Sequence, residues 1–151
     1  MLVAGIDIGS ISTKTAVLED GAILGTKVGF TGYNAGAAGR KMFDELLDSL
    51  GIEESSISRI VSTGYGRNSV DFANKSMTEI ICHGAGAHFL NPQIRTVVDV
   101  GGQDSKALIL DASGRVSDFV MNDKCAAGTG RFLEVMARAL EVDLDEFGEL
   151  S

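Results

Sequence analysis

Apolar residues recur along the first third of the chain with two different periods, and each period predicts one kind of element. Short apolar or alternating runs separated by polar turns predict three antiparallel strands, at Leu2–Ile8, Thr15–Leu18 and Ile23–Phe30. A helical spacing follows, formed by Met42, Phe43, Leu46, Leu47 and Leu50. Gly51 comes directly after these positions, where a glycine commonly ends a helix.

The middle of the chain combines a short strand, a glycine-rich loop and a weaker helix. Ile57–Ser62 predicts the strand, Thr63–Asn68 forms the loop, and the helical stretch runs from about Thr78 to Leu90. The loop either closes on a bound ligand or is an ordinary glycine turn, and the residues do not decide between the two. Pro92, the only proline, marks a natural boundary.

The strand pattern then begins again at an offset of 92 positions. Ile94–Val100, Lys106–Leu110 and Arg115–Val120 repeat the three-strand opening. A further amphipathic helix carries Phe132, Leu133, Met136, Ala139 and Leu140. We therefore expect a complete first unit at residues 1–92 and an incomplete second copy at residues 93–151. An incomplete copy predicts that the chain is a piece of a longer protein.

One polar sequence motif begins at the end of the first strand of each copy, at Asp7–Lys14 and at Asp99–Lys106. The strand ends in Asp-x-Gly, and a polar turn leads to Ser/Thr-Lys. Glycine lets the backbone approach a ligand closely, and lysine and hydroxyl groups suit phosphate oxygens. Two such hairpins predict one polyphosphate gripped from both sides. The predicted nucleotide-binding residues are Asp7, Gly9, Ser10, Ile11, Ser12, Thr13, Lys14, Asp99, Gly101, Gly102, Gln103 and Lys106.

Acidic residues beside bound phosphates predict a magnesium ion between them, because like charges would otherwise repel. We expect Mg²⁺ near Asp7, Asp99 and Asp104, held largely through water. Gln103 and Asp104 have no counterpart of the same kind in the first copy. Gln can orient an attacking water and Asp can polarise it, so these two are the predicted catalytic residues for hydrolysis of a γ-phosphate. The alternatives are an Asp that caps its own turn and an ordinary polar turn.

The composition bears on partners and compartment. A formal net charge of −8 without any cluster of Lys or Arg argues against nucleic acid and anionic membranes as partners. No apolar run approaches the roughly 20 residues of a membrane helix, and Asp7 comes too early for a secretory signal. Two cysteines do not make a disulfide framework, so we expect a cytoplasmic protein.

Cys125 is the cysteine to which a chemical role can be given. It precedes a Gly-x-Gly segment and a helix start, where the helix dipole stabilises a thiolate as ligand or nucleophile. Spacing alone favours the plainer alternative, a small buried hydrophobe. Cys82 is expected in the core. Neighbouring helix positions point in different directions, so Cys82 and His83 do not form a metal pair, and neither His83 nor His88 is assigned a role.

The two hairpins resemble the phosphate loops of the actin, sugar-kinase and Hsp70 superfamily of ATPases. The chain is more narrowly similar to the activators, or ATPase components, of 2-hydroxyacyl-CoA dehydratases and to benzoyl-CoA reductase ATPase subunits. The similarity extends over nearly the whole chain. The segments that carry it are Gly5–Ser10, Thr63–Asn68, Val98–Lys106 and Met121–Phe132.

The resemblance implies an α/β fold with a ribonuclease-H-like mixed sheet, as in actin-like ATPases, and an activity in which ATP hydrolysis drives one electron into the dehydratase. In this family a homodimer shares one four-iron four-sulfur cluster, and each subunit gives two cysteines. Cys125 matches the first of these ligands, and the second would lie beyond residue 151. The implied partners are a second copy, the dehydratase as electron acceptor, and a ferredoxin- or flavodoxin-like donor.

Two functions of other classes stay open from the residues. One is a small-molecule kinase of the same superfamily, for which the chain shows no substrate-binding signature and no use for Cys125. The other is a scaffold or filament-forming protein that binds nucleotide only for assembly. A reducible cluster would indicate the activator, a phosphorylated product the kinase, and light scattering with ATP the filament.

Overall fold

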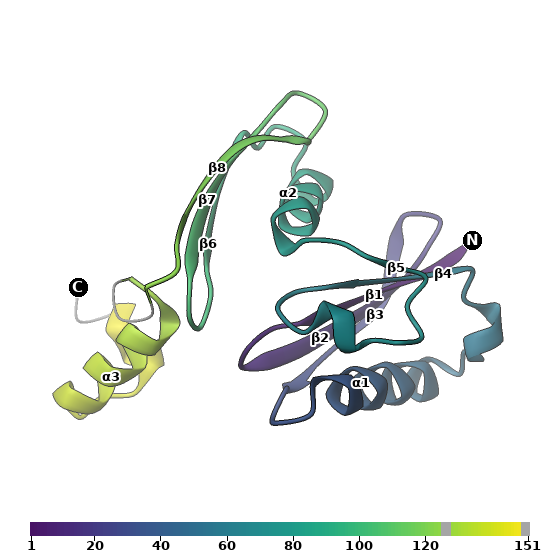
Figure 1. Cartoon of the computed structure of the whole chain (residues 1–151), viewed down its shortest axis with the longest axis horizontal. Coiled ribbons are helices and arrows are strands. Elements are labelled where there is room, and N and C mark those ends of the chain that lie inside the picture. The colour runs from purple at the N-terminus through teal and green to yellow at the C-terminus, as the bar shows by residue number, and fades with distance from the viewer. Residues whose placement is uncertain (125–127, 149–151) are drawn as a thin grey trace. The chain divides into compact units, whose positions relative to one another are not determined.

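The computed structural model describes residues 1–124 and 128–148, and the chain divides into two compact units. The first unit covers Met1–Cys82, and the second begins at His83, inside helix α2 (Glu79–Leu90). Each unit combines helices with a sheet, as Figure 1 shows. These compact units differ from the duplicated subdomains that the sequence predicts, so the subdomain boundary near residue 92 stays a prediction.

The first unit is built on a five-stranded mixed sheet of order β3-β2-β1-β4-β5. The first three strands are antiparallel, and β4 pairs in parallel with β1 after a crossover that contains helix α1 (Ala35–Leu50). This arrangement confirms the α/β class with a mixed sheet. The strands are β1 (Leu2–Ile8), β2 (Ser12–Glu19), β3 (Ala22–Phe30), β4 (Arg59–Thr63) and β5 (Lys75–Ser76).

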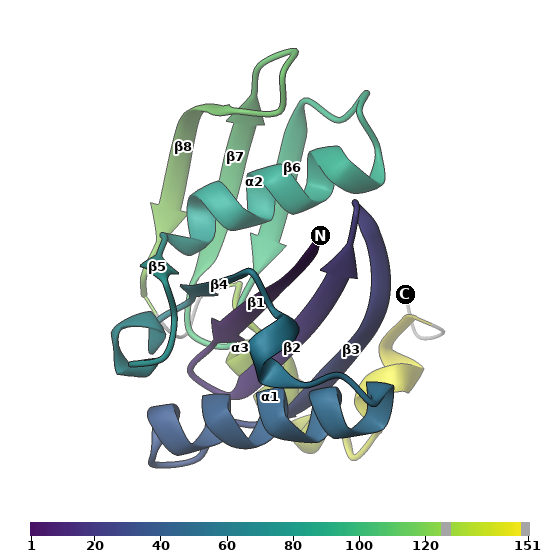
Figure 2. The ribbon, with the colours of Figure 1, turned by 90° about the vertical axis from the view of Figure 1, so that its right-hand side faces the viewer.

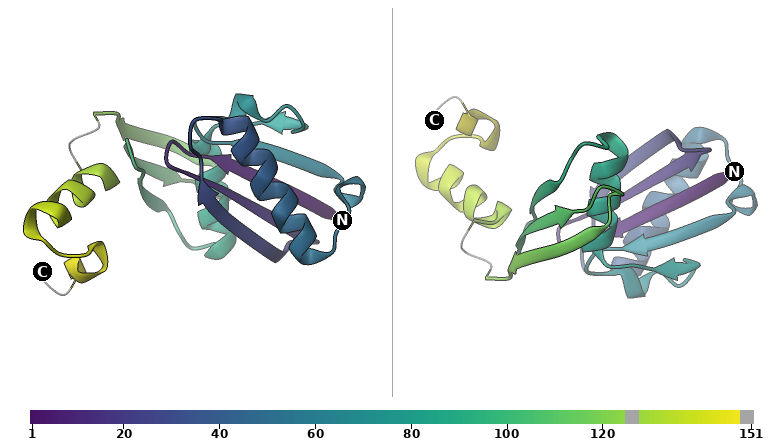
Figure 3. Two further views of the ribbon diagram at one scale, coloured as in Figure 1. Left: turned by 90° about the horizontal axis from the view of Figure 1, so that it is seen from below. Right: turned by 90° about the horizontal axis from the view of Figure 1, so that it is seen from above.

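The core of the first unit lies between the sheet and α1, which crosses one face of β1, β2 and β3 (Figure 3). Alternate side chains of β1 meet the apolar side of the helix, and Phe43 and Ile6 are fully buried there. Burying a side chain of this size contributes about 2–3 kcal/mol. Asn34 accepts a hydrogen bond from the Ala37 N–H at the start of α1, and Gly51 ends the helix as predicted, with φ of 65°.

The second unit holds a three-stranded antiparallel sheet of β6 (Thr96–Val100), β7 (Ser105–Leu110) and β8 (Val116–Asn122). Helix α2 lies across one face of this sheet (Figure 2). The approach is close at Gly84, where a Cβ would lie 2.7 Å from Val116 Cγ2. Helix α3 (Gly130–Leu140) follows β8.

The opening hairpins of the two units share one register. Asp7, near the end of β1, lies opposite Lys14 on β2, and Asp99 on β6 lies opposite Lys106 on β7. Each of these Asp–Lys pairs is also an ion pair. The two hairpins predicted from the repeated sequence device are therefore found with equivalent pairing.

The pairing of the second strand with the third is also alike in the two units. The register shifts once in each unit, between Val17 and Leu18 in the first and between Ile109 and Leu110 in the second. These positions differ by the same 92 residues that align the two sequence segments. The repeat of the three-strand opening is therefore confirmed, whereas truncation of a second copy stays a prediction.

Several element boundaries differ from those predicted. Strand β2 begins at Ser12 rather than Thr15, so Thr13 and Lys14 lie in the strand and not in the turn. Strand β7 likewise begins at Ser105, because polar residues continue a strand when their backbone groups pair with a neighbour. The apolar pattern therefore underestimates how far both strands reach.

The shortest elements were not predicted. They are β5 and the 3-10 helices η1 (Glu54–Ser56), η2 (Arg67–Ser69) and η3 (Leu144–Gly148), which are too short to show a period. Among the helices of the described ranges, none has both the length and the apolar character needed to cross a membrane.

Candidate functional site

The first hairpin turns within three residues, Gly9, Ser10 and Ile11. The Gly9 N–H donates to the Ser12 carbonyl oxygen at 3.0 Å, and the Thr31 N–H donates to the Ile11 carbonyl oxygen at 2.9 Å. A Cβ on Gly9 would lie 2.8 Å from that Ser12 oxygen, so the turn excludes any larger residue there. The backbone is thus held in a tight loop whose tip, at Ser10, is exposed.

Lys14 reaches back along this hairpin toward the end of β1. Its Nζ lies 3.2 Å from Asp7 Oδ2, and the lysine side chain is 46% exposed. An ammonium group has three donors and no fixed geometry, so an exposed lysine paired with one carboxylate can also bind an anion. The predicted phosphate-binding residues Ser10 and Lys14 therefore lie on one hairpin with their polar ends accessible to solvent.

Thr13, a predicted ligand residue, is turned to the interior of the first unit. It is fully buried, and its hydroxyl lies 3.0 Å from the hydroxyl of Thr31. Thr31 in turn donates to the Gly9 carbonyl oxygen at 2.8 Å. In this structure the Thr13 hydroxyl is therefore linked through Thr31 to the backbone of the turn. Its contact with a ligand stays a prediction.

The glycine-rich loop after β4 packs against the end of β1. Gly64 has φ of 84°, and a Cβ there would lie 2.3 Å from Asp7 Oδ1. The Gly66 N–H donates to the Ile8 carbonyl oxygen at 2.9 Å, and Arg67 donates to the Gly64 carbonyl oxygen at 3.0 Å. Sequence alone left the role of this loop open; the structure shows that it adjoins the predicted magnesium-binding carboxylate.

The same loop carries further polar groups near its ends. Arg67 pairs with Glu79 of α2 at 3.5 Å, which fastens the C-terminal side of the loop. Thr63, opposite Asp7 in the sheet, is 8% exposed. Its hydroxyl has no hydrogen-bond partner within the described parts of the chain. Neither residue was predicted as part of the site.

The second hairpin repeats the turn of the first. The Gly101 N–H donates to the Asp104 carbonyl oxygen at 2.8 Å, and a Cβ on Gly101 would lie 2.7 Å from Asp104 Oδ1. Gly102 and Gln103 form the tip, and Gln103 is exposed. These residues therefore form the same backbone turn as the first hairpin, and their predicted contact with phosphate stays a prediction.

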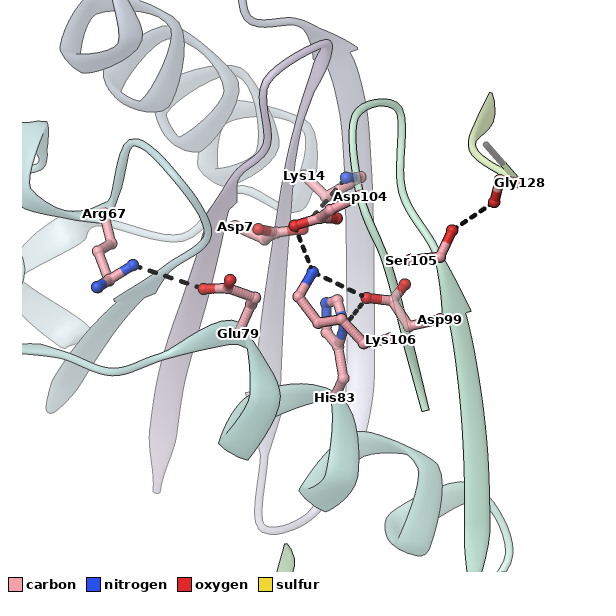
Figure 4. Close-up of polar contacts among 10 residues, drawn as sticks. All are labelled: Asp7, Lys14, Arg67, Glu79, His83, Asp99, Asp104, Ser105, Lys106 and Gly128. Atoms are coloured by element: carbon pink, nitrogen blue, oxygen red, sulfur yellow. Dashed lines mark hydrogen bonds and ion pairs between the residues drawn. The ribbon is translucent and has the colours of Figure 1, made fainter. Parts of the chain in front are cut away.

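The lysine of the second hairpin has different surroundings. Lys106 has a side chain only 3% exposed, and its Nζ lies 2.8 Å from Asp104 Oδ2 and 3.6 Å from Asp99 Oδ2. Figure 4 shows the ammonium group between the two carboxylates. Lys106 therefore neutralises a pair of acids, and its predicted contact with phosphate stays a prediction.

His83, to which the sequence assigned no role, contacts a predicted site residue. Its Nδ1 lies 3.0 Å from Asp99 Oδ2, and Figure 4 shows the ring directed from α2 at that carboxylate. The sequence offered no local signal, because the histidine and its partner are 16 residues apart on different elements. His88, five residues further on, does not share this contact: its ring lies against Gly114.

Cys125 lies outside the described residues, but the chain after it is tied to the second hairpin. The Ser105 hydroxyl donates to the Gly128 carbonyl oxygen, and the Gly130 N–H donates to the Gly101 carbonyl oxygen at 2.9 Å. Cys82, expected in the core, is half-buried with a free thiol. Over the described residues, no three His, Cys, Asp or Glu side chains gather closely enough to hold a metal ion.

Comparison with known proteins assigns the chain to one family of ATPases. The sequence profile of the BadF/BadG/BcrA/BcrD ATPase family matches residues 4–151. Because this match covers almost all of the sequence, the chain belongs to that family of ATPases.

Relatives and solved structures agree with this assignment and confirm the resemblance to dehydratase activators. The chain is 49% identical over 151 residues to the activator of lactoyl-CoA dehydratase from Anaerotignum propionicum, a match that covers 99% of the chain and 58% of the relative. Its fold matches that of component A of (R)-2-hydroxyglutaryl-CoA dehydratase from Acidaminococcus fermentans, with a TM-score of 0.92 and 40% identity, over 99% of the chain and 58% of that structure.

A second solved structure is that of the activator of 2-hydroxyisocaproyl-CoA dehydratase from Clostridium difficile with bound ADPNP. The match has a TM-score of 0.88 and 42% identity, and it covers 99% of the chain and 56% of that structure. The chain thus spans somewhat more than half the length of each of these three relatives.

Proposed function

We propose that this chain is the nucleotide-binding part of an ATP-hydrolysing activator that delivers an electron to a 2-hydroxyacyl-CoA dehydratase. Membership of an ATPase family and the similarity to relatives named as dehydratase activators support the proposal. The observation that carries it is the pair of hairpins with one turn geometry and one Asp–Lys register. Two such loops suit the two sides of a polyphosphate.

The first hairpin binds the phosphates of ATP in this proposal. The exposed ammonium group of Lys14 and the backbone N–H groups of the Ser10–Ser12 turn are the donors. The second hairpin contributes Gly102 and the exposed Gln103, which orients the attacking water. A Cβ at Gly9 or Gly101 would meet an oxygen of its own turn, so both tight turns depend on glycine.

Mg²⁺ is the metal that the acidic residues of both hairpins would hold. Asp7, Asp99 and Asp104 are partly accessible, with side chains 23%, 21% and 34% exposed, and carboxylate oxygens and water are the ligands this ion prefers. The bound ion would neutralise charge on the phosphates. Asp104 polarises the attacking water, and Lys106 fixes the orientation of its carboxylate.

The electron-carrying part of the proposal rests on Cys125 and on a second copy of the protein. A four-iron four-sulfur cluster shared by a homodimer would supply a one-electron carrier, with Cys125 as one of its ligands. The hydrogen bonds of Gly128 and Gly130 to the second hairpin support a role for this region near the nucleotide. A ferredoxin- or flavodoxin-like protein would be the donor, in the cytoplasm.

Anaerobic purification of the intact protein tests the proposal. We expect a brown protein with a reducible cluster signal, phosphate release from ATP, and ATP-dependent activation of a 2-hydroxyacyl-CoA dehydratase. Cys125→Ala should abolish the cluster signal and dehydratase activation while ATP binding is largely kept. Cys82→Ala is the matched control, and its half-buried thiol predicts a packing loss of about 1 kcal/mol and no loss of iron.

Two results would contradict the proposal. A Cys125→Ala protein that keeps its full iron content would remove the ligand role. A wild-type protein that phosphorylates a small molecule and never contains iron would replace the activator by a kinase.

A further inference from the structure

We propose that His83 is a positioning residue that fixes the carboxylate of Asp99 for its work at the nucleotide. The inference rests on the proposed function, in which Asp99 is one of the acids that would hold Mg²⁺ through water. His83 lies on α2, and its Nδ1 is 3.0 Å from Asp99 Oδ2. Because a carboxylate oxygen only accepts, the ring donates through Nδ1–H.

Both contacts of Asp99 fall on the same oxygen. His83 Nδ1 and Lys106 Nζ, at 3.0 Å and 3.6 Å, approach Oδ2. Within the described residues this leaves Oδ1 as the oxygen that can accept from a metal-bound water. A carboxylate that is held through one oxygen presents the other oxygen in a defined direction. At metal sites, hydrogen-bonding partners orient the ligating carboxylates in this way.

The helix that carries His83 is held close to the sheet. The next residue, Gly84, is buried, and a Cβ there would lie 2.7 Å from Val116 Cγ2 and 3.0 Å from Leu110 Cδ2. Because α2 packs this closely on the sheet, the His83 side chain can reach Asp99 on β6. The position of the ring is therefore set by packing of α2 against β7 and β8.

The equivalent acid of the first hairpin is supported differently. Asp7 receives Lys14 on Oδ2, and its Oδ1 lies against the backbone of Gly64. No histidine contacts Asp7 in the described parts of the chain. The histidine contact is thus specific to the second hairpin, which carries the predicted catalytic residues Gln103 and Asp104.

Three variants of the intact protein test the positioning role. His83→Leu keeps the bulk and removes the donor, whereas His83→Asn keeps an N–H at the same number of bonds from Cα as Nδ1. His88→Leu is the matched control, because it changes a histidine on the same helix that packs on Gly114 and does not contact Asp99. Circular dichroism and the thermal midpoint confirm folding of each variant.

We expect His83→Leu to lower the kcat of ATP hydrolysis by about 10- to 100-fold at saturating Mg·ATP, with little change in ADP affinity. His83→Asn should recover most of this loss, and His88→Leu should keep the wild-type kcat. A folded His83→Leu variant with wild-type kcat, or an Asn variant no better than Leu, would overturn the proposal.

A second readout does not depend on hydrolysis. ¹⁵N NMR of the labelled ring should show His83 as the Nδ1–H tautomer in the wild type, and Asp99→Ala should abolish that preference. If the wild type hydrolyses no ATP, the proposed function fails, and this measurement still decides the contact. An Nε2–H tautomer in the wild type would overturn the positioning of Asp99 by His83.

Discussion

The two hairpins have the same backbone and different lysines. In each, a glycine N–H closes the turn on the carbonyl oxygen three residues later, and an Asp faces a Lys across the strands. Lys14 is 46% exposed and contacts one carboxylate, whereas Lys106 is 3% exposed and lies between two. One structural device thus presents a positive charge to solvent in the first unit and neutralises acids in the second.

This difference indicates how a repeated element acquires two tasks. An accessible ammonium group is suited to binding an anion, because it can exchange water for phosphate oxygens. A buried ammonium group between carboxylates cannot leave them without a large desolvation penalty, so its effect is to hold them in place. In the proposed function, phosphate binding therefore belongs to the first hairpin, and control of the hydrolytic water belongs to the second.

The largest difference between the hairpins should appear in stability. Lys106→Met leaves Asp99 and Asp104 without their shared counter-charge, and it should lower the free energy of unfolding by about 3 kcal/mol. Lys14→Met breaks an accessible pair and should cost less than about 1 kcal/mol. Denaturant midpoints of the two variants measure both values, and equal losses would remove the distinction.

A smaller difference in stability is expected at the turns that join the second strand to the third in each unit. The turn after β2 closes with positive φ at Asp20 and Gly21, whereas the turn after β7 is closed by the side chain of Asp111. The Ser113 hydroxyl, followed by the Arg115 N–H, lowers the pKa of Asp111.

A lowered pKa in the folded state stabilises the protein at pH values above the unfolded pKa, and this contribution disappears as the pH falls through the folded pKa. The wild type should therefore lose slightly more stability than Asp111→Asn on acidification from about pH 5 to about pH 2. Thermal midpoints of the two proteins across this range measure the difference, and identical pH profiles would contradict it.

Much of the fold could be predicted because its signals are local. A short apolar run predicted β1, and helical spacing together with Gly51 predicted α1. The repeated Asp-x-Gly motif predicted both hairpins. Strand ends were less accurate, since Ser12 and Ser105 extend their strands through backbone pairing that no apolar pattern reveals.

The parts of the site that could not be predicted depend on contacts between distant elements. His83 reaches Asp99 because α2 packs closely at Gly84, and Gly64 touches Asp7 because the loop after β4 folds over β1. The burial of Lys106 has the same origin, since its sequence setting is nearly that of Lys14. Sequence can place such residues on a helix, strand or loop, whereas their partners depend on how these elements pack.

The division of labour between the hairpins is tested most directly by measuring nucleotide affinity and turnover for one variant of each. On the intact protein, Lys14→Ala should raise the Kd for ADP by about tenfold or more, because a charge-assisted hydrogen bond contributes about 1.5–3 kcal/mol. Gln103→Ala, which removes no charge, should leave this Kd within about twofold and lower the kcat of phosphate release by about 100-fold. Isothermal titration and phosphate release would contradict the account if both variants changed the same quantity by the same factor.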